Sequence, residues 1–179
     1  MRSWLRLSNG IDRLNLTLGR LVAWLALLMI AIGAYNAVGR YLGRFIGFNL
    51  SSNAYLELQQ YLFSALFLLS AAAVLARDEH VRVDVLYSRL SSRAKSWIDL
   101  TGTLLFLIPF CVLAIYMSWP AVQSSWAILE DSPDPGGLPR YPLKSLIPIS
   151  FALLIVQGVS QVIKQIASLR GREGQGERG

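Results

Sequence analysis

Four long stretches of the chain contain no Asp, Glu, Lys or Arg. They cover residues 21–39, 58–76, 100–129 and 145–163. An α-helix rises about 1.5 Å per residue, so about 20 residues cross a hydrocarbon core roughly 30 Å thick. The pattern therefore predicts an all-α integral membrane protein with four transmembrane helices.

The third stretch is longer than one crossing requires, because 30 residues of helix reach about 45 Å. We place the third span at 100–119 and expect the segment after it to emerge with Pro120 as a bend. Pro109, inside this span, predicts a kink, since proline removes one helical hydrogen bond. The other three spans are placed at 21–39, 58–76 and 145–163. Residues 1–164 then form one domain, and the polar tail 165–179 is expected to be disordered.

Basic residues are distributed unevenly between the two sides of this topology. Of the 17 Lys and Arg residues, 13 precede the first span, join the second and third spans or follow the fourth. Cytoplasmic segments carry such an excess, so both termini are expected in the cytoplasm. The net charge of +6 then follows from topology and from attraction to anionic phospholipids, and it needs no nucleic acid.

The first span is predicted to be retained rather than cleaved. A secretory signal has an apolar core of about 7 to 15 residues followed by small residues. Here the uncharged run is longer and leads into "NAVGRYLGRF", where bulky and basic residues follow. Multi-pass insertion is therefore expected from the first helix onward.

Two flanking segments show helical periodicity outside the spans. In the first, Ser8 or Asn9 is a candidate N-cap and Asp12 would lie in the first turn. Its apolar residues recur at helical spacing, which predicts an interfacial segment or an extension of the first span. The second, "DVLYSRLSSRAKSWIDL", predicts an amphipathic helix whose basic residues touch the anionic leaflet.

The start of the second span carries a carboxylate at the membrane edge. Glu57, Gln60 and Tyr61 share one helical face. Such an acid is either functional or a first-turn acid at the positive end of its helix. Small residues farther along the span predict close packing against protein. The candidate subunit interface is therefore Glu57, Gln60, Tyr61, Ser64 and Ala71.

The loop "LARDEHVRVDVLYSRL" contains the only histidine and is the main candidate for chemistry. A metal site from His80 and nearby carboxylates is conceivable. However, "HVRVDV" alternates polar and apolar residues, which predicts a structural segment whose polar side chains all face water on one side. The four spans lack the histidine that haem ligation commonly uses, and a single Cys111 cannot form a disulfide. We therefore predict no enzyme activity, no metal and no cofactor. We assign the loop to structure and lipid contact through His80, Arg82, Asp84, Arg89 and Arg93.

The order of these motifs resembles a known family. The stretches "ELQQYLFSALFLLSAAAVLARDEHVRVDVLYSRL" and "SWAILEDSPDPGGLPRYPLKSLIPISFALLIVQG" flank a proline-bearing third span. From about residue 13 to 164, the chain is similar to the small (DctQ-type) permease subunit of tripartite ATP-independent periplasmic (TRAP) transporters. The resemblance implies a non-catalytic subunit in the bacterial inner membrane. It would support a large membrane subunit in sodium-coupled uptake of organic acids delivered by a periplasmic solute-binding protein.

Under this resemblance, the outer face would dock the binding protein. Its candidate residues are Arg40, Arg44, Trp126, Glu130 and Arg140.

Two other functions are left open by the residues. One is a self-sufficient small dimeric transporter that uses Glu57, and the other is a membrane electron-transfer protein. No repeat relates the two pairs of spans, whereas repeats are the usual signature of a chain that binds substrate by itself. The absence of histidine from the spans disfavours the electron carrier.

Overall fold

The computed structural model describes residues 2–47, 51–77 and 90–176. The described helices are α1 (Arg2–Ile46), α2 (Asn53–Arg77), α4 (Ser92–Gly102), the π-helical segment η1 (Thr103–Leu107), α5 (Ile108–Ala127) and α6 (Tyr141–Gly176). Because α4, η1 and α5 follow one another without a break, the described residues form four long rods. All four are long and apolar enough to cross a membrane. The predicted all-α fold with four membrane helices is confirmed, and the described ranges contain no strand.

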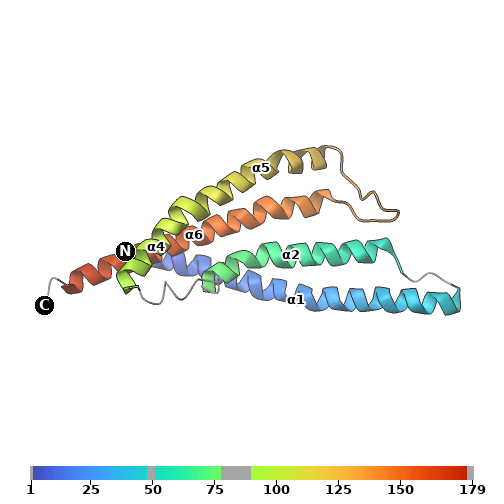
Figure 1. Ribbon diagram of the computed structural model, residues 1–179, viewed down its shortest axis with the longest axis horizontal. Coiled ribbons are helices and arrows are strands. Elements are labelled where there is room, and N and C mark those ends of the chain that lie inside the picture. The colour runs from blue at the N-terminus through green and yellow to red at the C-terminus, as the bar shows by residue number, and fades with distance from the viewer. Residues whose placement is uncertain (1, 48–50, 78–89, 177–179) are drawn as a thin grey trace.

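The rods run in alternating directions, so both termini lie at one end of the molecule (Figure 1). The segments that join α1 to α2 and α5 to α6 lie at the opposite end, which we call the loop end. Across the bundle the order is α5, α6, α2 and α1 (Figure 1). The most extensive contacts join α1 to α2, α5 to α6 and α2 to α6, and α1 also meets α6. The orientation of the two ends across the membrane stays a prediction.

The distribution of polarity is inverted relative to a water-soluble bundle. The largest fully buried side chains include Gln157, Asn15 and Asn36, whereas Trp24 and Phe67 are more than 60% exposed. Water would make such apolar exposure costly, at about 25 cal/mol per Å². In lipid, helices associate through close packing and polar contacts instead. The fold is therefore organised for a bilayer.

Helices α1 and α2 approach closely where small residues meet. A Cβ added to Gly19 would lie 2.4 Å from the Cβ of Ala73, which is much closer than real contacts allow. Ala72 and Ala73 are both buried. Because only a hydrogen occupies this position on Gly19, the two helix backbones can pack together.

The beginning of α1 corrects one prediction. The helix begins at Arg2, so neither Ser8 nor Asn9 is its N-cap and Asp12 is not in its first turn. The preceding residues are mainly leucine and arginine, which are good helix formers and extend the helix toward the terminus. Ser8 is instead buried and bonded to Ser160 on α6, with 2.7 Å between the two hydroxyl oxygens.

The third rod is one continuous helical path in its described part. It starts at Ser92, where the Ser91 hydroxyl accepts a hydrogen bond from the amide of Ala94. The predicted disturbance at Pro109 takes the form of η1, directly before it, where the amide of Ile108 bonds to the carbonyl of Thr103. One extra residue per turn accommodates a proline that cannot donate.

The third and fourth rods extend beyond the predicted spans. Helix α5 continues through Pro120 to Ala127, so this proline does not end it. Helix α6 begins at Tyr141 and has Pro142 in its first turn. It runs to Gly176, past the position where the sequence predicts that the ordered domain ends. Leu169 is buried, so helical packing extends at least this far.

Candidate functional site

One face of α2 holds the loop that joins α5 to α6. Asn53, Glu57 and Tyr61 follow at intervals of four residues and therefore share a face. The Asn53 amide donates to the carbonyl of Pro135 at 3.2 Å. The Tyr61 hydroxyl donates to the carbonyl of Pro139 at 2.5 Å. The loop between α5 and α6 is thus hydrogen-bonded to α2 over two turns of that helix.

Glu57 is the centre of this attachment. It is only 6% exposed. One carboxylate oxygen accepts from the Leu138 amide at 2.5 Å and the other accepts from the Ser132 hydroxyl. Gly137 makes the approach possible, because an added Cβ would lie 2.7 Å from the Glu57 carboxylate. Both oxygens are therefore engaged inside the chain.

A second attachment joins the same loop to the ends of α5 and α6. Glu130 forms an ion pair with Lys144, and its carbonyl accepts from the Arg140 amide at 2.7 Å. The hydrogen bond from Lys144 holds the pKa of the Glu130 carboxyl below its usual value. Trp126 donates to the Ser145 hydroxyl at 2.8 Å. Together, the two attachments fix both sides of the loop.

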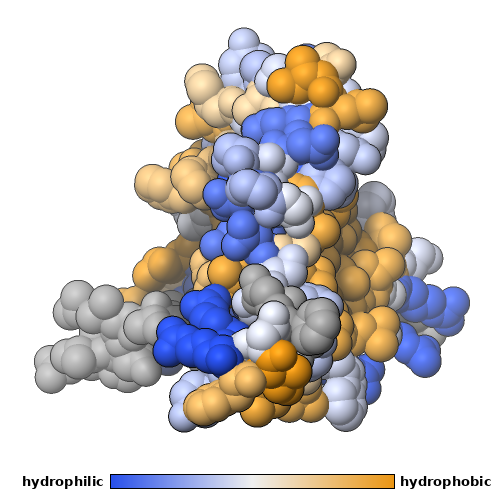
Figure 2. All heavy atoms as spheres, turned by 90° about the vertical axis from the view of Figure 1, so that its right-hand side faces the viewer, coloured by the Kyte–Doolittle hydropathy of each residue, from blue (hydrophilic) through white to orange (hydrophobic). Residues whose placement is uncertain are grey.

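The structure brings most of the predicted docking residues to the loop end. Trp126, Glu130 and Arg140 lie around the loop, and Arg40 and Arg44 are exposed near the end of α1. A polar cavity of about 250 Å³, lined in part by Arg40, Asn53 and Pro135, adjoins the same loop. In Figure 2, hydrophilic residues form a central band over this end and hydrophobic residues flank it on both sides.

The predicted interface residues of α2 have different environments. Glu57 and Tyr61 face the chain's own loop, Ser64 and Ala71 are half-buried, and Gln60 is exposed. Of the predicted cytoplasmic residues, Arg93 is exposed on α4. His80, Arg82, Asp84 and Arg89 lie outside the described residues.

A polar network near the end with the termini was not predicted from the sequence. The Asp12 carboxylate accepts from Gln157 at 2.9 Å and from Ser160 at 2.7 Å, and it forms an ion pair with Lys164. Asn15 also donates to Gln157 at 2.8 Å. The signal was present as a helical stripe of polar residues on each helix, Ser8, Asp12 and Asn15 on one and Gln157, Ser160 and Lys164 on the other.

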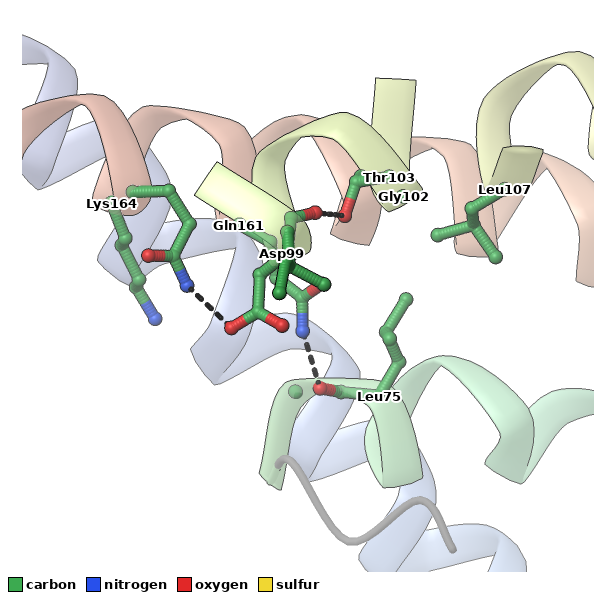
Figure 3. Close-up of a pocket in the computed structure, with 10 residues that line it drawn as sticks. Leu75, Asp99, Gly102, Thr103, Leu107, Gln161 and Lys164 are labelled. Carbon is green, nitrogen blue, oxygen red and sulfur yellow. Dashed lines mark hydrogen bonds between the residues drawn. The ribbon is translucent and has the colours of Figure 1, made fainter. Parts of the chain in front are cut away.

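A cavity of about 590 Å³ lies beside this network, between α2, α4, η1 and α6. Figure 3 shows Leu75, Asp99, Thr103 and Gln161 around it. Gln161 donates to the Leu75 carbonyl at 2.9 Å, and Thr103 donates to the Asp99 carbonyl at 2.8 Å. The first bond joins α6 to α2 beside the cavity, whereas the second lies within the third rod. Across the described ranges, no group of three or more His, Cys, Asp or Glu side chains could hold a metal ion.

A comparison with models of protein families identifies the family to which this chain belongs. The model for the DctQ component of tripartite ATP-independent periplasmic transporters matches residues 29–168. The chain belongs to the DctQ family. The matched segment begins inside α1 and includes all of α2, α5 and the loop end. This DctQ chain is a small membrane subunit of a transporter with four membrane-length helices. No curated protein and no solved structure matches it significantly.

Proposed function

We propose that this chain is the non-catalytic small subunit of a sodium-coupled importer of organic acids in a bacterial inner membrane. A large membrane subunit would carry the substrate and sodium sites, and a periplasmic solute-binding protein would deliver the substrate. Family membership supports the small-subunit role. The internal attachments of the loop end support a structural task rather than transport by this chain alone.

The main support for the proposal is that both carboxylate oxygens of Glu57 are hydrogen-bonded within the chain. A carboxylate that binds a cation or proton during transport needs an oxygen directed toward the transport path. Both oxygens of Glu57 accept hydrogen bonds from the loop. Removing this acceptor would leave the Ser132 hydroxyl and the Leu138 amide without their partner. Glu57 is therefore assigned to holding the loop.

The loop end is the proposed docking face for the binding protein. Arg40, Arg44 and Arg140 supply positive charge there, and Trp126 supplies an aromatic surface. Complementary charge increases association rates and selects partners. Because α2 and α6 hold the loop from two sides, the face is organised before a partner arrives, which reduces the entropy lost on binding. The uneven distribution of basic residues favours placing this end in the periplasm.

The remaining surfaces are assigned to the large subunit and to lipid. Gln60, Ser64 and Ala71 leave part of α2 uncovered, and small residues favour helix contact in membranes. The predicted cytoplasmic residues, including Arg93, would contact anionic phospholipids.

The first experiment is gentle affinity purification of the chain from native membranes, followed by mass spectrometry and an uptake assay. We expect an equimolar, larger multi-span protein. Glu57→Ala should lower both the recovery of that protein and uptake, whereas Glu57→Gln, which keeps one acceptor oxygen, should retain more of both. Full recovery of the complex with lost uptake in Glu57→Ala would contradict the structural role. Recovery of this chain alone, as a dimer that binds a ligand, would favour the self-sufficient transporter.

A further inference from the structure

The first half of α1 has an apolar face that nothing in the described chain covers. Leu7, Leu14, Leu21 and Leu28 recur every seven residues and are between 48% and 63% exposed. Trp4 and Ile11 lie three positions before the first two of them, which completes the heptad spacing of a helix that packs against another helix. A neighbouring face of the same segment is polar and is bonded to α6 through Ser8, Asp12 and Asn15. This segment therefore directs its polar side inward and its apolar side outward.

A shallow, open groove lies along the surface of α1 itself. It has a volume of about 490 Å³ and is lined by Gly10, Arg13, Leu14, Thr17, Leu18 and Leu21. A Cβ added to Gly10 would have no neighbour within 4 Å. A larger side chain at Gly10 would therefore meet open space, with leucines on one side of the groove and Arg13 on the other.

The arginines beside this face distinguish a protein partner from lipid. Arg6, Arg13 and Arg20 are exposed and repeat every seven residues, so they are spread over about 21 Å of helix axis. The headgroup region of one leaflet is only about 5 to 8 Å thick. Helix α1 is continuous from Arg2 to Ile46 (Figure 1), and its uncharged part crosses the bilayer. The phosphate groups of one leaflet therefore cannot bind all three arginines at once. The apolar residues beside them would likewise extend beyond the hydrocarbon core.

The charges also distinguish a different chain from a second copy. Between residues 2 and 28 the only acidic residue is Asp12, and α6 already binds its carboxylate. The same segment of a second copy would offer leucines and arginines to the arginine row and no available acid. A partner helix with acidic side chains along one edge would be complementary.

We infer that the face Trp4–Leu28 of α1 receives a helix of the large membrane subunit, with apolar residues at heptad spacing and acidic side chains facing Arg6, Arg13 and Arg20. The inference rests on the proposed function, which supplies the large subunit. It adds a contact surface outside the second span and assigns the chemistry of its partner.

Site-specific photocross-linking in the full complex tests this contact. A benzoylphenylalanine cross-linker is placed at Leu14, in the groove, or at Asn9, an exposed residue of the same helix outside the groove. We expect an adduct with the large subunit from Leu14 and much less from Asn9. An adduct of two copies of this chain, a lipid adduct alone, or equal yields from both positions would overturn the inference.

A charge exchange provides the second measurement. Arg13→Glu should lower the recovery of the large subunit several-fold, whereas Arg13→Lys, which keeps the positive charge, should retain most of it. Equal recovery for Arg13→Glu and Arg13→Lys would contradict the acidic partner. If the unmodified chain recovers no large subunit, the proposed function fails. If it recovers the large subunit but Leu14 gives no adduct with it, only this inference fails.

Discussion

Asp12 on α1 and Lys164 on α6 form an ion pair that joins two helices far apart in sequence. The Asp12 carboxylate also accepts hydrogen bonds from Gln157 and Ser160. The pair lies near the end where both termini meet, and it turns the polar side of α1 toward α6. The apolar side is consequently left outside, where the proposed partner helix binds.

Asp12→Ala should destabilise the isolated subunit by about 1 to 3 kcal/mol, since hydrogen bonds to charged groups contribute in this range. Lys164→Ala should cost less, because Gln157 and Ser160 still bind the carboxylate and Lys164 is partly exposed. Unfolding of both single variants and the double variant in detergent would give the coupling energy. Arg20→Ala, on the exposed side of α1, is the control and should change stability by less than about 0.5 kcal/mol. Additive effects of Asp12→Ala and Lys164→Ala would contradict the coupling.

Gly19→Ala should separate α1 from α2, because the new Cβ would lie 2.4 Å from the Cβ of Ala73. Overpacking of this kind typically costs about 1 to 3 kcal/mol. Gly10→Ala, on the same helix with open space around it, should be neutral or stabilising by up to about 1 kcal/mol through helix propensity. Thermal unfolding of the isolated subunit checks the pair, and similar melting temperatures for the two variants would show that α1 and α2 are not closely packed there.

Tyr61→Phe should loosen the loop end, since it removes the hydrogen bond from the hydroxyl to the Pro139 carbonyl. A single neutral hydrogen bond contributes about 0.5 to 1.5 kcal/mol. The measurement is the rate of trypsin cleavage after Arg140, which follows the carbonyls that Tyr61 holds. Tyr116→Phe, on a tyrosine that is 72% exposed on α5, should leave the rate unchanged. An unaltered rate in Tyr61→Phe would mean that the loop is held by other contacts.

The second attachment of the loop should weaken in acid. Lys144 holds the pKa of Glu130 below its ordinary value of 4.5. A lowered folded-state pKa gives stability that is present above the ordinary pKa and is lost as the pH falls through the folded value. Glu130→Gln should therefore be less stable than the unmodified chain at pH 7, and the difference should shrink as the pH falls below about 4.5. A difference that is constant from pH 7 to pH 3 would rule out this ionisation as its source.

The four membrane helices could be predicted from the sequence because each depends on a local property. A run without charged residues must lie in lipid or protein wherever its neighbours are. The small residues of α2 could be interpreted for the same reason. The N-cap assigned to Ser8 or Asn9 was wrong because capping depends on whether the preceding residues continue the helix, and here they do.

The partners of the polar residues could not be predicted in the same way. For Glu57 the sequence left open a functional role and a role as a first-turn acid. The residue lies beyond the first turn of α2, and its partners Ser132 and Leu138 lie far along the chain. Asp12 was interpreted as a first-turn acid, whereas α6 binds it. A polar residue in an apolar segment needs a hydrogen-bonding partner, but the sequence does not indicate which residue that partner is.

The sequence by itself determined that this is a helical membrane protein of the DctQ family, because hydropathy and the order of the motifs are properties of the linear sequence. The tertiary structure alone decided which polar groups are used internally and which faces are left for other molecules. The physical reason is that a hydrogen bond or ion pair depends on distance in space, and two helices can bring together groups that the sequence separates widely.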